Sequence, residues 1–328
     1  MKKRMFFAIL SATLVLGIAF HLPAQGRETR TVRVSMGYIP NVQFAPWYVA
    51  EALGYFARED IKVEMDYSMD VDGLLLLGQG KKDFAVAGGD MVIIGRSQGL
   101  PITYVATLYA RFPVSIVSLA AADIKTLGDL RGKRVGLPFL SGTSYIAMRA
   151  MLAQAKMQES DLRLLAVGYT QIQSLLTDKI DAAVVFANNE PVQLAVQGHK
   201  FFQINSSDYF PLVGHGLVTS ERLIKEDPAL VRAFTRATVK AMDYTLHNPK
   251  EAFKLVQKAI DLPEKDAEVQ YRVLQASMRL WENAYTGKHG LGSSDPAAWA
   301  DSQRFMLEHG FIKSTTDVRK IMSNAFLK

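Results

Sequence analysis

Short apolar runs rich in β-branched residues alternate with longer amphipathic runs from Thr31 onward, and this alternation is typical of an α/β protein. The first set of runs predicts one doubly wound unit, in which each strand is followed by a helix that returns the chain to the same sheet. Its predicted strands are Val32–Tyr38, Ile61–Tyr67, Asp83–Ala87 and Ile102–Tyr109, and its predicted helices are Phe44–Phe56, Val71–Gln79 and Met91–Gln98.

A second doubly wound unit follows near Pro113. Its predicted strands are Val114–Ala120, Arg134–Leu137, Leu162–Val167, Ala182–Phe186 and Phe201–Ile204, and its predicted helices are Ser144–Ala155, Ile172–Leu176 and Glu190–Gln197. One more strand, Leu212–Thr219, then leads into a tail whose period is helical from Glu221 onward. The tail is predicted to form helices over Pro228–His247, Lys250–Ile260, Glu264–Trp281 and Pro296–His309.

A helical tail needs an apolar surface to cover, and the sheet of the first unit would otherwise lack a complete helical layer. The pattern therefore predicts a discontinuous first domain, residues 31–112 plus 214–328, with a second domain, residues 113–213, inserted into it. Two chain crossings between the domains would form a hinge.

The N-terminus has the three parts of a secretory signal peptide. Lys2, Lys3 and Arg4 precede an apolar run from Met5 to Phe20, and small residues end at Ala24. We expect residues 1–24 to be removed on export to the periplasm. The alternative is an uncleaved membrane anchor, for which about 16 apolar residues are few against a hydrocarbon layer of about 30 Å.

Composition narrows the function further. Removing the three basic residues of the leader reduces the 38 Lys and Arg to 35 against 32 Asp and Glu, so the formal charge falls from +6 to about +3. This balance gives no reason to expect a nucleic-acid partner. Cysteine is absent from all 328 residues, which excludes disulfides, thiolate nucleophiles, Cys-ligated metals and a lipid anchor on cysteine.

Motifs of the common enzyme classes are also absent. The six histidines show no HExxH or paired metal-ligand spacing, and the chain contains no nucleophile elbow, no P-loop and no GxGxxG fingerprint. We therefore expect no metal, no cofactor and no catalytic residue. The short tract Gly88-Gly89-Asp90 follows a strand and opens a helix, where Asp90 could contact a ligand, although such glycine pairs are usually tight turns.

Backbone N–H groups are predicted to be available at the start of the helix that follows the strand Arg134–Leu137. The tract Ser141–Tyr145 (SGTSY) opens this helix, and a helix start presents free N–H groups and the positive end of its dipole. Ser144 and Tyr145 could donate to a ligand there. Helix capping explains the same hydroxyl groups equally well.

Aromatic residues gather where strands are predicted to end, and ligands of open α/β sheets bind beyond the carboxyl ends of the strands. Tyr38, Trp47, Tyr109 and Tyr169 are the candidates for stacking on a flat heterocycle. Phe44 is a further candidate, although Tyr48 lies four residues after it and that spacing favours core packing for the pair.

Polar candidates follow the strand Ala182–Phe186. Asn188 and Glu190 precede a helix, and the proline after Glu190 favours an extended backbone that directs the carboxylate away from the helix. The amides of Asn188 and Asn189 and the carboxylate of Glu190 could bind the polar edge of a heterocycle, or they could only cap the helix. Asn41 could contribute in the same way.

Several tracts together resemble a known family. These are GYIPNVQFAPWYVA from Gly37, GYF from Gly54, LGDLRGKRVG from Leu127 before a Gly-Thr-Ser helix start, and ANNEP from Ala187. The chain resembles substrate-binding proteins of the thiamine-pyrimidine-synthesis-like group of ABC importers over its whole mature length. The resemblance implies the type II periplasmic-binding fold, in which two doubly wound α/β lobes joined by two crossover segments close over a small ligand.

Within that group the chain is most similar to the riboflavin-binding members, since Tyr38-Ile39-Pro40-Asn41 stands where pyrimidine-binding members have Trp-Thr-Pro-Asn. The resemblance implies a monomer that delivers riboflavin, or a related flat vitamin, to an ABC permease and its ATPase. A binding protein for a thiamine pyrimidine precursor is the alternative. A pyrimidine-synthesis enzyme is a further one, and for it only His215 is placed near the expected cleft.

Overall fold

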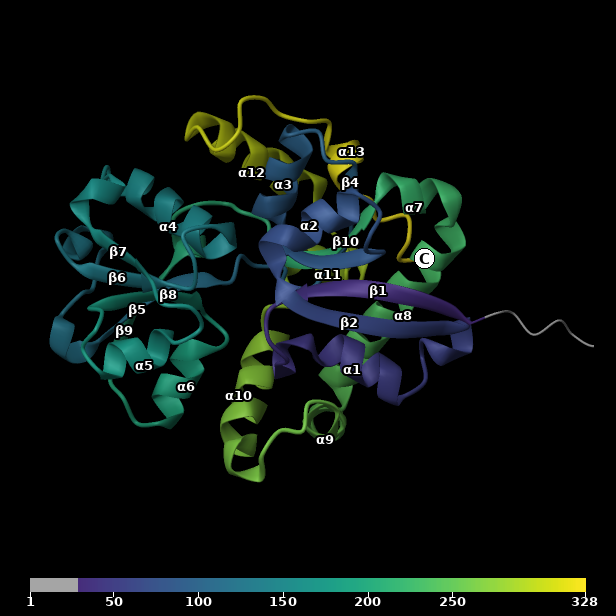
Figure 1. The fold of residues 1–328 in the computed structure, drawn as a ribbon, viewed down its shortest axis with the longest axis horizontal. Coiled ribbons are helices and arrows are strands. Elements are labelled where there is room, and N and C mark those ends of the chain that lie inside the picture. Colours follow the sequence, from purple (N-terminus) through teal and green to yellow (C-terminus); the bar gives the residue numbers. More distant parts are fainter. Residues whose placement is uncertain (1–28) are drawn as a thin grey trace, which may run out of the picture.

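The computed structural model describes residues 29–328, apart from the side chains of residues 68–72, and the proposed signal peptide lies outside this range. Two five-stranded sheets lie side by side, as Figure 1 shows. We call the part built on the first sheet the first lobe and the part built on the second sheet the second lobe. The helices cover both faces of each sheet (Figure 1).

The first sheet has the strand order β2-β1-β3-β10-β4. β1 runs parallel to β2 and β3, whereas β10 runs antiparallel to β3 and β4. β3 reads FAVAG and is buried along its whole length, as expected for a strand covered by helices on both faces. The strands are β1 (Arg30–Gly37), β2 (Ile61–Met69), β3 (Phe84–Gly88), β4 (Ile102–Thr107) and β10 (His215–Ser220).

The second sheet has the strand order β7-β6-β8-β5-β9. β6 pairs in parallel with β7 and β8, and β5 is antiparallel to β8 and β9. In each sheet, one strand follows a crossing from the other lobe and runs antiparallel to the strands on both sides of it. This strand is β10 in the first sheet and β5 in the second. The strands are β5 (Val114–Leu119), β6 (Arg134–Leu137), β7 (Arg163–Ala166), β8 (Ala182–Phe186) and β9 (Phe201–Asn205).

Helices α2 and α3 lie over one face of the first sheet and α1, α8 and α9 over the other, while α4 lies over one face of the second sheet and α5 and α6 over the other (Figure 1). The first-lobe helices before the crossover are α1 (Ala45–Ala52), α2 (Asp70–Gly78) and α3 (Gly89–Ser97), and the second-lobe helices are α4 (Gly142–Gln154), α5 (Gln171–Leu176) and α6 (Glu190–Val196). The C-terminal helices are α7 (Glu221–Glu226), α8 (Pro228–His247), α9 (Pro249–Ala259), α10 (Ala267–Met278), α11 (Ala284–His289), α12 (Pro296–Glu308) and α13 (Val318–Ile321).

The helical tail covers the first sheet, as its sequence pattern predicts. Helix α8 begins where Asp227 accepts a hydrogen bond from the Leu230 N–H, and Pro228 occupies its first turn. On its buried face Phe234 stacks on Phe84 of β3, with ring centroids 4.3 Å apart, and on Phe56, at 4.9 Å. The tail is therefore part of the first lobe's core.

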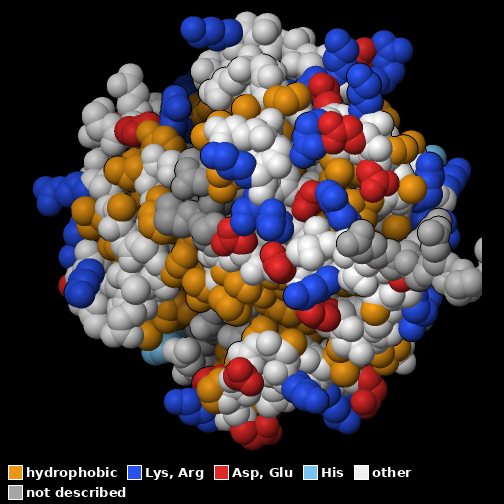
Figure 2. Space-filling model, turned by 45° about the vertical axis from the view of Figure 1, so that its right-hand side comes forward, with side chains coloured by type: hydrophobic (Ala, Val, Ile, Leu, Met, Phe, Trp, Pro, Cys, Tyr) orange, Lys and Arg blue, Asp and Glu red, His pale blue; other side chains and the backbone are white. Residues whose placement is uncertain are grey.

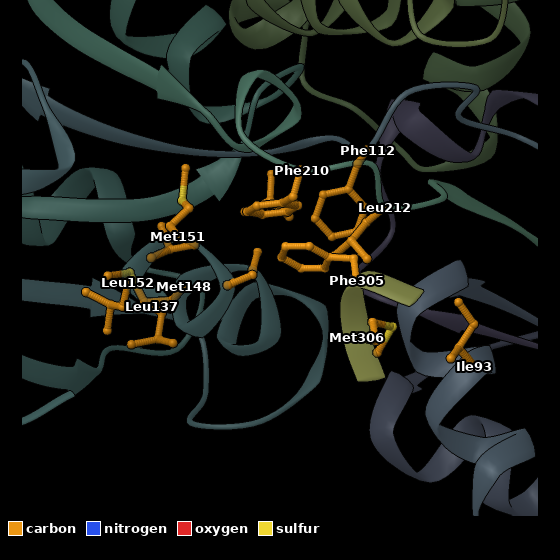
Figure 3. Close-up of a cluster of buried hydrophobic side chains, with 14 of the residues drawn as sticks. Ile93, Phe112, Leu137, Met148, Met151, Leu152, Phe210, Leu212, Phe305 and Met306 are labelled. Atoms are coloured by element: carbon orange, nitrogen blue, oxygen red, sulfur yellow. The ribbon is translucent and has the colours of Figure 1, made fainter. Parts of the chain in front are cut away.

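Residues 108–113 and 206–214 connect the two lobes. An aromatic cluster holds these segments together, in which Phe210 stacks on Phe305 of α12 at 5.1 Å and packs edge-on against Phe112 at 6.1 Å (Figure 3). This pairing of strands and crossings supports the division into residues 31–112 plus 214–328 and residues 113–213 that we propose from the sequence.

Two elements differ from the sequence prediction for local reasons. The helix expected over Phe44–Phe56 ends at Ala52, and Gly54 follows with φ +67°, a conformation that favours glycine. The strand expected from Leu212 begins at His215, because Gly214 still belongs to the crossover. A Cβ atom on Gly214 would lie 2.1 Å from the carbonyl oxygen of Tyr109.

Charged side chains of both signs are interspersed over the face drawn in Figure 2, with apolar side chains grouped near its centre. That face therefore presents no extended field of one sign. Within residues 29–328, no helix combines the length and the apolar character that crossing a bilayer requires.

Candidate functional site

A cavity of about 830 Å³, counting the part that opens to solvent, lies between the lobes. The cavity is bounded by the carboxyl ends of β1, β6, β7 and β8 and by the start of the antiparallel strand β10. It therefore occupies the edge at which ligands bind in open α/β sheets.

Both lobes line the cavity. The first lobe contributes Met36, Gly37, Tyr38, Gln43, Phe44, Val86, Leu108, Tyr109 and His215, and the second contributes Pro138, Phe139, Ser141, Gly142, Thr143, Ser144, Tyr169, Gln171, Phe186, Asn189 and Glu190. A ligand held there would contact both lobes at once, so that its binding would favour their approach.

One wall of the cavity is aromatic. Tyr169 packs edge-on against Tyr38 of the opposite lobe, with ring centroids 4.6 Å apart, and against Phe139 at 5.4 Å. On another side, Phe186 packs edge-on against His215 of the other lobe at 5.2 Å. Rings in these arrangements leave faces and edges that suit a flat aromatic ligand.

Glu190 is the carboxyl group in the cavity wall. Its Oε2 accepts a hydrogen bond from the Phe186 N–H at 3.0 Å, and its Oε1 accepts one from Asn189 Nδ2 at 3.1 Å. Burial outweighs these hydrogen bonds and raises the pKa of Glu190 to about 7. Near neutral pH the group is therefore present both as an acid, which can donate, and as a carboxylate, which only accepts.

His215 lies at the start of β10 and is buried in the cavity wall. Burial lowers the pKa of His215 to about 4, so the imidazole is neutral over the physiological range. Its Nδ1 atom has no hydrogen-bond partner among the described residues. The ring thus adds polarity to the cavity without adding charge.

The N-terminus of α4 also faces the cavity. Gly142 at its first position has φ +71°, and the capping residue Ser141 makes no side-chain hydrogen bond to the helix. Thr143 Oγ1 donates instead across the lobes to Asp90 Oδ1 at 3.1 Å. The loop before α4 therefore contributes both to the cavity wall and to the contact between the lobes.

A second connection between the lobes lies at the other side of the cavity. Asn188 Nδ2, from the second lobe, is 2.8 Å from Gln43 Oε1, 2.8 Å from Ser277 Oγ and 3.2 Å from Tyr109 Oη. Tyr109 Oη in turn donates to Gln43 Oε1 at 3.2 Å. Burial raises the pKa of Tyr109, which stays protonated and keeps this donor.

The structure brings part of the sequence-based candidate set together. Six of the eleven candidates line the cavity, namely Tyr38, Phe44, Tyr109, Ser144, Tyr169 and Glu190. The interlobe contacts involve two more, Asp90 and Asn188, which do not line the cavity themselves.

The remaining three candidates lie elsewhere. Trp47 is 1% exposed and packs in the first-lobe core against Phe44, at 6.1 Å. Asn41 caps a short 3-10 helix by accepting from the Gln43 N–H at 3.0 Å. The Tyr145 hydroxyl donates to Glu159, in the 3-10 helix Glu159–Asp161, at 2.8 Å. Residues that are close in sequence to the cavity lining can thus belong to the core, cap a helix or lie at the surface.

Sequence reasoning did not select Gln43, Phe139, Thr143 and Gln171, although all four line the cavity. Phe139 and Gln171 follow the ends of β6 and β7, so the strand-end rule that selected Tyr169 could have found them. Gln43 carries no such signal, because it lies in a 3-10 turn rather than directly at a strand end.

Known proteins with a similar sequence or fold agree with this architecture. Residues 41–252 match the family model described as NMT1/THI5 like. The riboflavin-binding protein RibY of Chloroflexus aurantiacus is 38% identical over 90% of this chain and 86% of its own. The formylaminopyrimidine-binding protein of Halalkalibacterium halodurans is 27% identical over 95% of this chain and 96% of its own.

Among solved structures, the alkanesulfonate-binding protein SsuA from Xanthomonas axonopodis pv. citri, bound to MOPS, superposes with a TM-score of 0.69. The match covers 90% of this chain and 99% of that protein at 14% identity, so it concerns the fold alone. It confirms the two-lobed α/β fold expected from the sequence. The match to the family model and the 38% identity likewise confirm the expected relationship, and the chain belongs to the NMT1/THI5-like family of proteins with the periplasmic-binding fold.

Proposed function

We propose that this protein binds riboflavin in the periplasm and delivers it to the permease of an ABC importer. The observation that carries the proposal is the interlobe cavity, in which aromatic side chains from both lobes meet a small set of uncharged or weakly acidic polar groups. An isoalloxazine ring is flat and largely apolar with a polar edge, and it matches such a lining.

The charge of the lining supports a neutral ligand. None of the described residues that line the cavity is Lys or Arg, and its carboxyl group, Glu190, is partly protonated near pH 7. Phosphate and sulfonate ligands favour Arg or Lys partners. Riboflavin carries neither group, whereas its phosphorylated form would bring a charge with no partner here.

The relatives support the same ligand class and a binding role. The two curated relatives described above are named for binding riboflavin and a formylaminopyrimidine, and both cover nearly the whole chain. The higher identity is to the riboflavin-binding protein. We therefore favour a ligand-binding role over a catalytic role. Export to the periplasm rests on the leader pattern of residues 1–24.

A pyrimidine precursor of thiamine is the second candidate, and Glu190 is the observation in its favour. A partly protonated carboxyl group beside the Asn189 amide can pair with the edge of an aminopyrimidine. The higher identity to the riboflavin-binding protein keeps the flavin as the first candidate.

Fluorescence titration tests the choice. Protein lacking residues 1–24 is unfolded to strip bound ligand, refolded, and titrated with riboflavin, while binding of formylaminopyrimidine is followed by calorimetry. We expect saturable quenching of flavin fluorescence at micromolar riboflavin. Tyr169→Leu should abolish most of the binding, whereas Tyr271→Leu, at an aromatic contact with Phe253 outside the cavity, should not.

Saturable binding of the pyrimidine without flavin quenching would replace riboflavin by the second candidate. Absence of binding for both ligands would contradict the proposal altogether. Native mass spectrometry of protein purified from rich medium gives an independent answer, since a ligand that co-purifies reveals its own mass.

A further inference from the structure

The side-chain amide of Gln43 has its oxygen fully occupied within the protein. Its Oε1 accepts from Asn188 Nδ2 at 2.8 Å and from Tyr109 Oη at 3.2 Å. An amide oxygen has two lone pairs, so these donors use both of them. The residue is buried, with 6% of its surface exposed, and it lines the cavity.

The orientation of the Gln43 amide follows from these contacts. Since Oε1 faces the two donors, Nε2 lies on the other side of the amide, and none of the described residues accepts a hydrogen bond from it. An N–H₂ group of a residue that lines a ligand cavity can donate to an acceptor on the ligand. A ligand that presents an acceptor at this position therefore fits Gln43 better than one that presents a donor.

The three residues that set this orientation come from different parts of the fold. Gln43 lies in the 3-10 turn before α1 and Tyr109 lies in the first crossover, whereas Asn188 follows β8 of the second lobe. Asn188 does not itself line the cavity. Its amide is also held by Ser277 of α10, which packs against α6.

We propose that Gln43 Nε2 donates a hydrogen bond to a carbonyl oxygen of the ligand, and that Asn188 is the positioning residue that fixes the Gln43 amide when the lobes close. This inference rests on the proposed function, because it names the ligand edge that the riboflavin site binds. When the lobes separate, Gln43 Oε1 loses its second-lobe donor and the amide can rotate. Closure thus completes the donor that the ligand needs.

The two candidate ligand classes present different groups to a donor at Gln43. The polar edge of an isoalloxazine carries carbonyl acceptors, whereas the exocyclic amino group of an aminopyrimidine is a donor. A fixed N–H₂ group at Gln43 favours the first edge and opposes that amino group. Gln43 would therefore contribute to specificity between the two ligand classes found in this family.

Gln43→Glu is the sharpest substitution when binding is measured well above pH 7, because the ionised carboxylate keeps acceptors for Asn188 and Tyr109 and replaces only the donor. We expect its affinity for riboflavin to fall about 30-fold, since two acceptors would then face each other in a buried site. Gln303→Glu is the matched control, a buried glutamine in α12 whose amide hydrogen-bonds the backbone of Thr316 outside the cavity, and the affinity of this variant should stay at the wild-type value. Gln43→Met, which has no charge, also lacks the donor and should weaken binding if Gln43→Glu does not fold.

Infrared spectroscopy of bound riboflavin distinguishes a positioning role of Asn188 from a purely structural role. A donor at the flavin carbonyl lowers its stretching frequency, so the band should move to higher frequency in Gln43→Glu. Asn188→Ala should shift or broaden the same band, although Asn188 does not line the cavity. A purely structural role for Asn188 predicts a lower melting temperature with the carbonyl band unchanged.

The outcomes distinguish this inference from the proposed function. If the wild-type protein does not bind riboflavin, both are overturned. If it binds riboflavin but Gln43→Glu and Gln43→Met bind equally well and the carbonyl band stays in place, only the inference is overturned. An unchanged band in Asn188→Ala alone overturns the positioning role and leaves the donor role of Gln43.

Discussion

Replacing Glu190 by Gln should change how the stability of the ligand-free protein depends on pH. Burial raises the pKa of this carboxyl group from 4.5 to about 7, which means that the folded protein holds the proton more tightly than the unfolded chain does. The contribution of Glu190 to stability is then fully present below pH 4.5. It is lost progressively as the pH rises from 4.5 to about 7.

The size of the effect follows from the shift. A pKa change from 4.5 to about 7 corresponds to about 3 kcal/mol, at about 1.36 kcal/mol for each pH unit, so the contribution of Glu190 to the stability of the wild-type protein should fall by about 3 kcal/mol as the pH rises across this range. Solvent screening does not reduce this free energy, because Glu190 is buried, with 8% of its surface exposed. In the Glu190→Gln variant this contribution is absent at every pH.

Urea unfolding at intervals between pH 4 and pH 8 measures the effect. The difference in the free energy of unfolding between Glu190→Gln and wild type should shift by about 3 kcal/mol in favour of the variant between pH 4.5 and pH 7, and should stay constant above that. Glu308→Gln, at an exposed position at the end of α12, serves as the control and should show only a constant offset. A pH-independent difference for Glu190→Gln would refute the reasoning, because it would mean that the buried carboxyl titrates normally.

Three further predictions use different groups. Because burial lowers the pKa of His215 from 6.5 to about 4, the contribution of His215 to stability should fall by about 3 kcal/mol as the pH drops through that range, and the difference in the free energy of unfolding between His215→Phe and wild type should shift by this amount in favour of the variant in acid unfolding curves. Thr143→Val removes the interlobe hydrogen bond to Asp90, so riboflavin affinity should drop about fivefold in a fluorescence titration, while the melting temperature of the ligand-free protein changes little. Trp47→Ala should lower the free energy of unfolding by about 3–5 kcal/mol by leaving a core cavity, with bound riboflavin at saturation unaffected; a loss of binding by folded protein would contradict the core position of Trp47.

The alternation of apolar strands and amphipathic helices was sufficient to predict most of the fold. Arg134–Leu137, Ala182–Phe186 and Pro228–His247 have the predicted bounds. Ala182–Phe186 is wholly apolar, and Pro228–His247 is a long amphipathic run that begins with a capping Asp and a Pro. Boundaries shift where a distant contact decides them. Gly214 is such a case, since its place in the crossover depends on the carbonyl of Tyr109, about a hundred residues earlier.

The site was less predictable than the fold. Strand ends identify which loops meet at the cavity, and so they selected Tyr38, Tyr169 and Glu190. They do not specify where each side chain points within a loop. Trp47 and Tyr145 lie close in sequence to cavity residues, yet one packs in the core and the other bonds to Glu159.

The residues of the interlobe contacts illustrate the limit most clearly. Gln43 and Asn188 are 145 positions apart, and neither has a local pattern that would pair them. Their function depends on the relative position of two lobes, which local propensity does not encode. Such pairs become visible only when both sheets are placed, and they are where a closing protein can combine ligand specificity with conformational change.

The two titrating groups in the cavity wall have opposite shifts, and this has a consequence for the ligand. His215 is neutral above pH about 4, and Glu190 is protonated below pH about 7. Between these values neither group carries a charge, so a neutral ligand enters without having to compensate one. An anionic ligand would find no cation among the described lining residues at any pH in this interval, and above pH 7 it would meet a carboxylate. The same burial that shifts the two pKa values thus also favours an uncharged vitamin over its phosphorylated form.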